Sequence, residues 1–409
     1  MELFDCKGYR IVHTPTDSDI TNVRVVVNAG SRNEDDDSHG TAHFLEHMFY
    51  KGTEKRDFRE INRITSRLGE ANAYTGRGQT CYHFTFLQQD LAEALDVLLD
   101  MVFNASFPEE EFSKEKGVIT EECQMYLDDP IRYFFQVLNE KTLGTPFGHP
   151  IIGTLANISD TTLEKLRRFR GRHYNPANML IACAGNVKKE RLEEELNKLL
   201  PEVETNSNAY PSPALNFDDH TFTHASKQAI IALVAEGITT KSEIDEDYMP
   251  DIFAKGLGGI SHSLLFERLR EELGLCYYVG ASHTSSEDYG HLVIYVLLDE
   301  SNIETAIAEC WKIVEKVREE GFTDDLRSIC KRNYLFKLGR QMETSCGLNA
   351  MADSFFSLDG YPFDDYMSFD ERRKKVEAVT NNHIKEFANR VLGQGKAVKT
   401  ITMTQEENK

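Results

Sequence analysis

The chain has 409 residues, of which 40% are hydrophobic and 28% are charged, a globular composition with room for two domains. Its formal net charge of −21 argues against a nucleic-acid partner, because phosphate binding needs clustered lysine and arginine. We also expect no membrane segment, since no apolar run reaches the roughly 18 residues of a membrane helix and the first residues lack the pattern of a signal peptide. The acidity suits basic peptide substrates, and it suits solubility alone equally well.

Eight cysteines are scattered along the chain, with no pair in C-x-x-C spacing. In a chain of this length they indicate reduced, mostly buried thiols and a cytoplasmic protein, not a disulfide framework. They also leave no cysteine-based zinc site.

The first half of the chain predicts extended stretches followed by a pair of helices. The opening residues, 1–19, indicate a strand that enters the fold directly. Thr80–Leu87 is a further extended stretch, and Leu91–Val102 has apolar residues at helical spacing. Phe107–Glu122 is again helical after its proline.

The second half repeats this order beyond a linker. The segment Pro201–Phe217 is rich in Pro, Asn and Ser and has no apolar period, which is typical of a linker. Beyond it, the extended stretch His291–Leu298 precedes the helical segments Ile303–Val314 and Phe322–Lys337. These helical segments follow their counterparts by roughly 212 to 215 residues, which indicates a tandem duplication.

This pattern predicts an α+β fold built from two homologous tandem domains. Each domain is expected to pack a mixed, mostly antiparallel sheet against helices. The expected boundaries are 1–205 for the first domain, 206–217 for the linker and 218–409 for the second domain.

The segment TAHFLEHMFY, Thr41–Tyr50, places two histidines and a glutamate in an otherwise apolar stretch. On a helix, positions i and i+4 share a face, so His43 and His47 can both reach one ion, and Glu46 borders that face. Two imidazoles make part of a catalytic zinc set, and a glutamate that is not a ligand can deprotonate a water on the metal. The alternative is that all three are core residues, which would bury them at a real desolvation cost.

A third ligand should be Asp, Glu or His on another element, and the helical segment Glu109–Pro130 offers candidates. Glu115 and Glu122 lie two helical turns apart and share a face, whereas Glu121 points about 100° away. The alternative for this pair is a solvated helix face in an acidic protein.

Three segments, GTAHFLEHMFYKGT, LGEANAYTGRGQTCYHF and EKGVITEECQMYLDDP, resemble the inverted-zinc-motif peptidases. That family includes pitrilysin, insulin-degrading enzyme and the catalytic subunit of mitochondrial processing peptidase. The resemblance covers nearly the whole chain, and its motifs are highly specific in combination. The length is similar to that of the half-sized branch, in which each chain carries two homologous domains.

The resemblance implies that His43, His47 and Glu122 bind one Zn²⁺ per chain and that Glu46 is the general base. Glu115, on the same helix face as Glu122, would not bind the metal itself. Its carboxylate would support the site by holding a ligand in place. Mn²⁺ or Co²⁺ could occupy the same ligands.

The segment NAYT, Asn72–Thr75, resembles the edge strand that lies beside the zinc in this family. The resemblance implies that backbone groups of Ala73 and its neighbours pair with an extended substrate peptide. It also implies that the Asn72 side chain holds a substrate carbonyl. By itself, Asn72 could equally be an ordinary turn residue.

The second half has no H-x-x-E-H motif, and the helix offset aligns Glu122 with Lys337, which cannot bind a metal. Its segment Gly256–Gly280 is similar to a family stretch that carries an arginine and a tyrosine seven residues apart. The resemblance implies that Tyr277 donates to the scissile carbonyl oxygen and that Arg270 anchors a substrate carbonyl. Without the resemblance, the pair would be a helix-face arginine and a core tyrosine.

Together these features favour a zinc metalloendopeptidase that cleaves peptides or unfolded precursor segments inside a closed chamber. In the long relatives the zinc domain and the domain that carries the arginine and the tyrosine belong to opposite halves of a clamshell. The resemblance therefore implies a clamshell dimer here, either a homodimer or a heterodimer with a related subunit. One alternative is a non-catalytic peptide-binding or scaffold subunit of a processing-peptidase-like complex. Another is a zinc hydrolase that acts on a different bond type.

Overall fold

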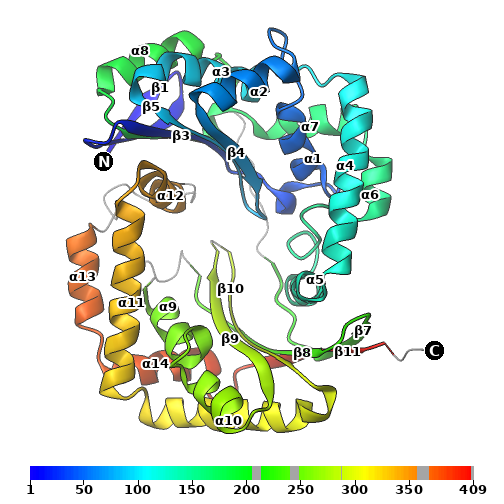
Figure 1. Cartoon of the computed structure of the whole chain (residues 1–409), viewed down its shortest axis with the longest axis vertical. Coiled ribbons are helices and arrows are strands. Elements are labelled where there is room, and N and C mark those ends of the chain that lie inside the picture. Colours follow the sequence, from blue (N-terminus) through cyan, green and yellow to red (C-terminus); the bar gives the residue numbers. More distant parts are fainter. Residues whose placement is uncertain (205–212, 240–247, 287, 357–367, 407–409) are drawn as a thin grey trace. The chain divides into compact units, whose positions relative to one another are not determined.

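The computed structural model describes residues 1–204, 213–239, 248–286, 288–356 and 368–406, which form two compact units (Figure 1). Part of the predicted linker, residues 205–212, lies outside the described residues. Unit 1 consists of 1–128, 145–211 and 340–366. Unit 2 consists of 129–144, 212–339 and 367–409.

Unit 1 is built on a six-stranded sheet with the strand order β1-β2-β6-β3-β5-β4. Strands β2 and β6 are parallel, and every other neighbouring pair is antiparallel. The strands are β1 (Glu2–Cys6), β2 (Tyr9–Pro15), β3 (Ile20–Val27), β4 (Gly69–Thr75), β5 (Thr80–Leu87) and β6 (Met179–Gly185). The helices are α1 (Thr41–Phe49), α2 (Phe58–Leu68), α3 (Leu91–Asn104), α4 (Glu109–Asp128), α6 (Leu155–Asp160), α7 (Leu163–His173), α8 (Lys189–Leu199) and α12 (Ser345–Phe356).

The central strand β3 explains why helices cover both faces of this sheet. Because successive side chains of a strand point to opposite faces, Val23 and Val25 pack into the main core, whereas Val26 packs on the other face. Figure 1 shows α2, α3 and α8 along one face and α12 along the other.

Helix α12 is held on the second face by polar contacts as well as by apolar packing. The side-chain amide of Asn349 is fully buried and donates to the Asn22 carbonyl at 2.6 Å and to the Ala182 carbonyl at 3.2 Å. The Ser345 hydroxyl donates to the Ile20 carbonyl at 2.6 Å. These bonds tie a helix from the second half of the sequence to the sheet of the first half.

Unit 2 is built on a five-stranded sheet with the strand order β7-β11-β8-β10-β9. Strands β7 and β11 are parallel, and the other neighbouring pairs are antiparallel. The strands are β7 (His220–His224), β8 (Ala229–Glu236), β9 (Cys276–Ser285), β10 (Gly290–Leu298) and β11 (Val398–Gln405). The helices are α5 (Pro130–Leu143), α9 (Tyr248–Ala254), η5 (Lys255–Gly259), η6 (Phe266–Glu272), α10 (Ile303–Glu320), α11 (Asp324–Met342), α13 (Phe369–Glu377) and α14 (Asn381–Leu392).

The topology confirms the predicted α+β fold with two homologous tandem parts. If β1 is set aside, the two sheets have the same order, and each contains one parallel pair at the equivalent position. The predicted strand Thr80–Leu87 is β5 with the same bounds. Helix α4 begins at Glu109, directly after Pro108 as predicted, and Phe107 before the proline has a left-handed backbone at φ 52°.

Two helices belong to the unit formed mainly by the other half of the sequence. Phe134 and Leu138 of α5 pack against Ile230, Val293 and Met403 in the core of unit 2, and α12 packs in unit 1. A cut at 206–217 would therefore separate each of these helices from its own unit. Among the described residues, no helix is long and apolar enough to cross a membrane.

Replacement of Asn349 by Ala should lower the free energy of unfolding by about 1–3 kcal/mol, because two buried carbonyl groups lose their donor. Urea unfolding followed by circular dichroism would measure the change. Asn197→Ala is the matched control, since exposed Asn197 on α8 makes one hydrogen bond, to the Glu193 carbonyl at 2.9 Å. Equal effects of the two substitutions would contradict the anchoring role of Asn349.

Candidate metal centre

The residue that precedes helix α1, Gly40, must be a glycine. Gly40 has a left-handed backbone at φ 88°, and a Cβ there would lie 2.5 Å from the Ile152 carbonyl oxygen. Because glycine cannot cap a helix with a side chain, Glu34 supplies the acceptor. Its carboxylate accepts from the backbone N–H of Gly40 at 2.8 Å and of Ala42 at 2.7 Å. Negative charge at this end is also favoured by the helix dipole.

The capping carboxylate of Glu34 is itself fully buried. His149 Nε2 lies 2.9 Å from it, and the His149 ring stacks on His39 at 3.8 Å between centroids. Burial raises the pKa of the Glu34 carboxyl well above its usual range, and the two N–H groups of the helix oppose that shift. A buried polar contact therefore determines where α1 begins. Sequence reasoning missed Glu34, because it caps from the preceding loop at no standard capping spacing.

Helices α1 and α4 bring together the three side chains that were expected to bind one ion. His43 and His47 lie one turn apart on α1, with ring centroids separated by 4.6 Å. On α4, Glu122 Oε2 lies 3.8 Å from Nε2 of His43 and 3.5 Å from Nε2 of His47. Ligand atoms of the three residues all lie within 4.8 Å of one another.

This arrangement fits a tetrahedral Zn²⁺. Bonds of about 2.0–2.1 Å at tetrahedral angles place neighbouring ligand atoms about 3.3–3.4 Å apart. The separations of 3.5 and 3.8 Å are close to that value and too long for good hydrogen bonds. Burial, with the nearby His47, lowers the pKa of His43 to about 3, so that its imidazole is neutral and can act as a ligand.

Glu115 contacts the second imidazole, that of His47. Its Oε1 lies 2.8 Å from Nδ1 of His47, which leaves Nε2 facing Glu122. Burial raises the pKa of Glu115, but hydrogen bonds from His47 and Lys51 outweigh it and hold that pKa below its usual value. Glu115 is only 4% exposed, so a solvated helix face is the wrong description for this residue.

Lys51 is a neighbour of the site that sequence reasoning missed. Its Nζ lies 2.5 Å from Glu115 Oε2, so the carboxylate is held between a lysine and a histidine. The available signal was its spacing, since Lys51 follows His47 by four residues. The contact lies just past the end of α1, however, where helical spacing alone is a weak guide.

His43, His47 and Glu122, whose ligand atoms converge, are called the three-donor group below. Glu46 lies on α1 but is not a member of this group. Its Oε2 accepts a hydrogen bond from the hydroxyl of Thr75, the last residue of β4. Burial raises the pKa of Glu46, and the hydrogen bond from Thr75 and the charge of His47 offset part of that rise. A carboxylate with a raised pKa is suited to accept and return a proton.

Asn72 and Ala73 lie in the middle of β4, which pairs with β5 and with no other described strand, and so forms an edge of the unit 1 sheet. Along β4 the exposure alternates, and Ala71 and Ala73 face the core while Asn72 faces outward. The Asn72 side-chain oxygen accepts from the Ala73 N–H at 2.8 Å. The two residues are therefore on a strand, not in a turn.

Arg270 and Tyr277 lie in unit 2, on η6 and β9. The Arg270 guanidinium lies 5.7 Å from the centroid of the Tyr277 ring, and Tyr277 is 71% exposed, so it is not a core residue. The adjacent Tyr278 instead pairs with the Tyr295 hydroxyl at 3.3 Å. Lys337, aligned with Glu122 by the helix offset, forms an ion pair with Asp251 at 3.2 Å.

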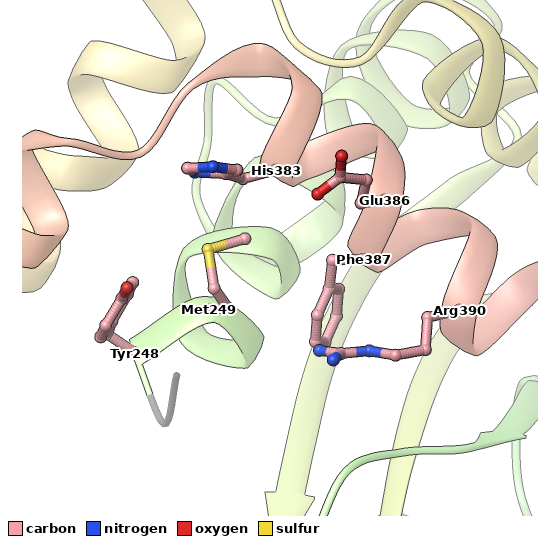
Figure 2. Close-up of a pocket in the computed structure, with 6 residues that line it drawn as sticks. All are labelled: Tyr248, Met249, His383, Glu386, Phe387 and Arg390. Carbon is pink, nitrogen blue, oxygen red and sulfur yellow. The ribbon is translucent and has the colours of Figure 1, made fainter. Parts of the chain in front are cut away.

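Figure 2 shows a separate cavity in unit 2, between α9 and α14, of about 150 Å³. It is lined by Tyr248, Met249, His383, Glu386, Phe387 and Arg390. His383 Nδ1 accepts from the Thr380 N–H at 3.3 Å and so completes the cap of α14. The converging three-donor group found in the described part of the chain lies on α1 and α4, not here.

Family models match both halves of the chain. Residues 10–155 match the model described as Insulinase (Peptidase family M16), and residues 160–334 match the one described as Peptidase M16 inactive domain. The chain belongs to peptidase family M16. Within this M16 chain, the first match spans the three-donor group, and the second spans Arg270 and Tyr277.

Relatives of this M16 chain include proteins named as zinc proteases. An uncharacterized zinc protease of Bacillus subtilis (strain 168) is 35% identical over 70% of this chain and 71% of its own length. One from Rickettsia bellii is 32% identical over 73% of each. A probable mitochondrial-processing peptidase subunit beta of Arabidopsis thaliana is 38% identical over 44% of this chain and 34% of its own length.

Solved structures share the fold of this M16 chain. A protease from Helicobacter pylori has a TM-score of 0.88 at 20% identity, over 98% of this chain and 99% of that one. A Pseudomonas fluorescens structure described as a peptidase M16 inactive domain has the same TM-score at 18% identity, over 99% and 98%. At these identities the likeness concerns the fold, and it confirms the half-sized, two-domain M16 architecture.

Glu115→Gln should weaken zinc binding by about 10- to 100-fold, because His47 loses the carboxylate that orients its ring. Competition with a chromophoric chelator would measure the dissociation constant. Glu121→Gln is the matched control, because Glu121 is exposed on the same helix. An unchanged affinity of the Glu115→Gln protein for zinc would contradict the supporting role.

Proposed function

We propose that this M16 chain is a zinc-dependent metalloendopeptidase that cleaves peptides or unfolded precursor segments. The observation that carries the proposal is the convergence of His43, His47 and Glu122 within 4.8 Å, beside a carboxylate that is not part of the group. The zinc-protease names of the relatives support it at the level of the family.

In this proposal His43, His47 and Glu122 would hold one Zn²⁺, and a bound zinc would supply Lewis-acid chemistry for a peptide carbonyl and for water at the site. Glu46 takes a proton from the attacking water and returns it to the leaving amine. Glu115 keeps the His47 ring oriented through Nδ1.

We propose that the substrate peptide adds to the sheet as a strand beside β4. Among the described residues, no strand of unit 1 pairs with the outer edge of β4, whose backbone groups can therefore pair with a peptide. Backbone pairing through Ala73 and its neighbours would bind peptides of varied sequence, with the Asn72 amide on a substrate carbonyl. The net charge of −21 suits basic peptides, as it also suits solubility.

We further propose a dimer that encloses the peptide, in which Tyr277 and Arg270 of one subunit complete the metal site of the other. Tyr277 would donate to the carbonyl oxygen as it gains negative charge, and Arg270 would hold a neighbouring carbonyl. The support is the exposure of Tyr277, because a large aromatic residue that is 71% exposed is available to a partner or a substrate.

Glu46→Gln should still bind zinc but lose about 10²–10⁴-fold in kcat, because the amide cannot accept the proton of the attacking water. His43→Ala should instead lose the metal. Metal analysis and cleavage of a quenched fluorescent peptide would measure both, with Glu121→Gln as the control. Full activity of the Glu46→Gln protein would end the general-base assignment.

The rival function is a non-catalytic scaffold or peptide-binding subunit. The description of the second family model as an inactive domain concerns residues 160–334, a range that does not contain the three-donor group. A protein with one zinc per chain that binds peptides and leaves every one intact would favour the scaffold. Zinc-dependent cleavage of an ester or of a non-peptide amide, without cleavage of peptides, would favour a hydrolase that acts on another bond type.

Mixing Glu46→Gln with Tyr277→Phe should restore activity that neither variant shows alone, if the site is shared between subunits. With random re-pairing, about a quarter of the wild-type activity is expected, because half of the dimers are mixed and each mixed dimer has one intact site. Peptide cleavage after mixing and sizing by light scattering would test this. A wild-type protein that is monomeric at micromolar concentration and fully active would contradict it.

A further inference from the structure

Thr75 connects the edge strand to the carboxylate of Glu46. It is the last residue of β4, and its side chain lies on the same face of the strand as Ala71 and Ala73. From that position its hydroxyl donates to Glu46 Oε2. Among the described residues, the Glu46 side chain has no other hydrogen bond.

The backbone of Thr75 is held firmly enough to aim this hydroxyl. Thr75 pairs with Thr80 in the antiparallel ladder between β4 and β5. The next residue, Gly76, donates to the Gln79 carbonyl at 2.7 Å and closes the turn. Thr80 in turn donates to the Ala29 carbonyl at 2.9 Å and is fully buried. The end of β4 is therefore fixed by contacts that do not involve Glu46.

A hydrogen bond to one carboxylate oxygen leaves the other free for proton transfer. A glutamate side chain has three rotatable bonds, and a displacement of 1 Å in a catalytic group can cost about 100-fold in rate. A single well-aimed donor to Oε2 removes much of that freedom. Thr75 also belongs to β4, the strand beside which the peptide is proposed to bind. The same strand would therefore position both the peptide and Glu46.

We propose that Thr75 is a positioning residue that holds the Glu46 carboxylate and sets the peptide register on β4 relative to it. This inference rests on the proposed function, because it concerns the base of that reaction. It assigns the threonine of the segment NAYT a role separate from that of Asn72 and Ala73, which are expected to contact the substrate.

The test compares Thr75→Val, which keeps the β-branched shape but removes the hydroxyl, with Thr75→Ser, which keeps the hydroxyl. Thr75→Val should lower kcat by about 10- to 100-fold with KM within about twofold, and Thr75→Ser should recover most of the loss. Thr221→Val is the matched control, because Thr221 is an exposed threonine on β7, an edge strand of unit 2. If the valine variant folds poorly, Thr75→Ala must show the same loss of kcat.

Measurements other than the turnover of Thr75→Val separate positioning from a structural effect. The dissociation constant for zinc and the thermal midpoint should stay at their wild-type values in Thr75→Val. Peptide affinity should be equal in Glu46→Gln and in the double variant Glu46→Gln/Thr75→Val, and the second substitution should cause no further loss of kcat.

The outcomes distinguish this inference from the function on which it rests. If Glu46→Gln is inactive and Thr75→Val has wild-type kcat, the positioning role is wrong and the proposed function stands. If Glu46→Gln is fully active, the proposed function itself fails. Loss of zinc or a rise in KM as large as the fall in kcat/KM in Thr75→Val would also overturn the positioning role, because it would show damage to the strand.

Discussion

Everything at the candidate centre depends on bringing three ligand atoms to one point from two helices that are distant in the sequence. His47 and Glu122 can meet only if α1 and α4 are fixed in rotation and along their axes. The contacts that fix them are buried and polar: Glu34 at the start of α1, and Glu115 between His47 and Lys51. A buried polar group without a partner is costly, so the contact of Glu34 fixes the start of α1 and the contacts of Glu115 join α4 to α1 and Lys51.

Much of the centre could be predicted because a helix converts spacing into direction. The separations of four residues on α1 and seven on α4 put the expected side chains on the right faces before any packing is known. Sequence reasoning missed Glu34, Lys51 and Thr75, because their contacts arise where separate elements pack. Thr75, for example, meets Glu46 across 29 residues and from a strand. No local period specifies such a contact.

At the level of the fold, the duplication was visible in the order of segments, and the two sheets repeat the same strand order. The sequence did not indicate that α5 and α12 each pack in the unit formed mainly by the other half. A segment rich in Pro and Ser predicts a boundary between domains, and it does not indicate which helix covers which sheet. The pairing of α12 with its sheet depends on buried groups such as Asn349, and one asparagine among many carries no visible signal.

The late position of α12 in the sequence has a consequence for synthesis on the ribosome. The sheet of unit 1 is complete once Gly185 has been added, but α12 begins only at Ser345. At about 5–20 residues per second, the interval is roughly 8 to 32 s. Throughout that time Val12, Val26 and Leu180 on this face lack the packing that Ala352 of α12 provides in the finished fold. The expected metal ligands His43, His47 and Glu122 are thus synthesised long before the helix that completes their unit.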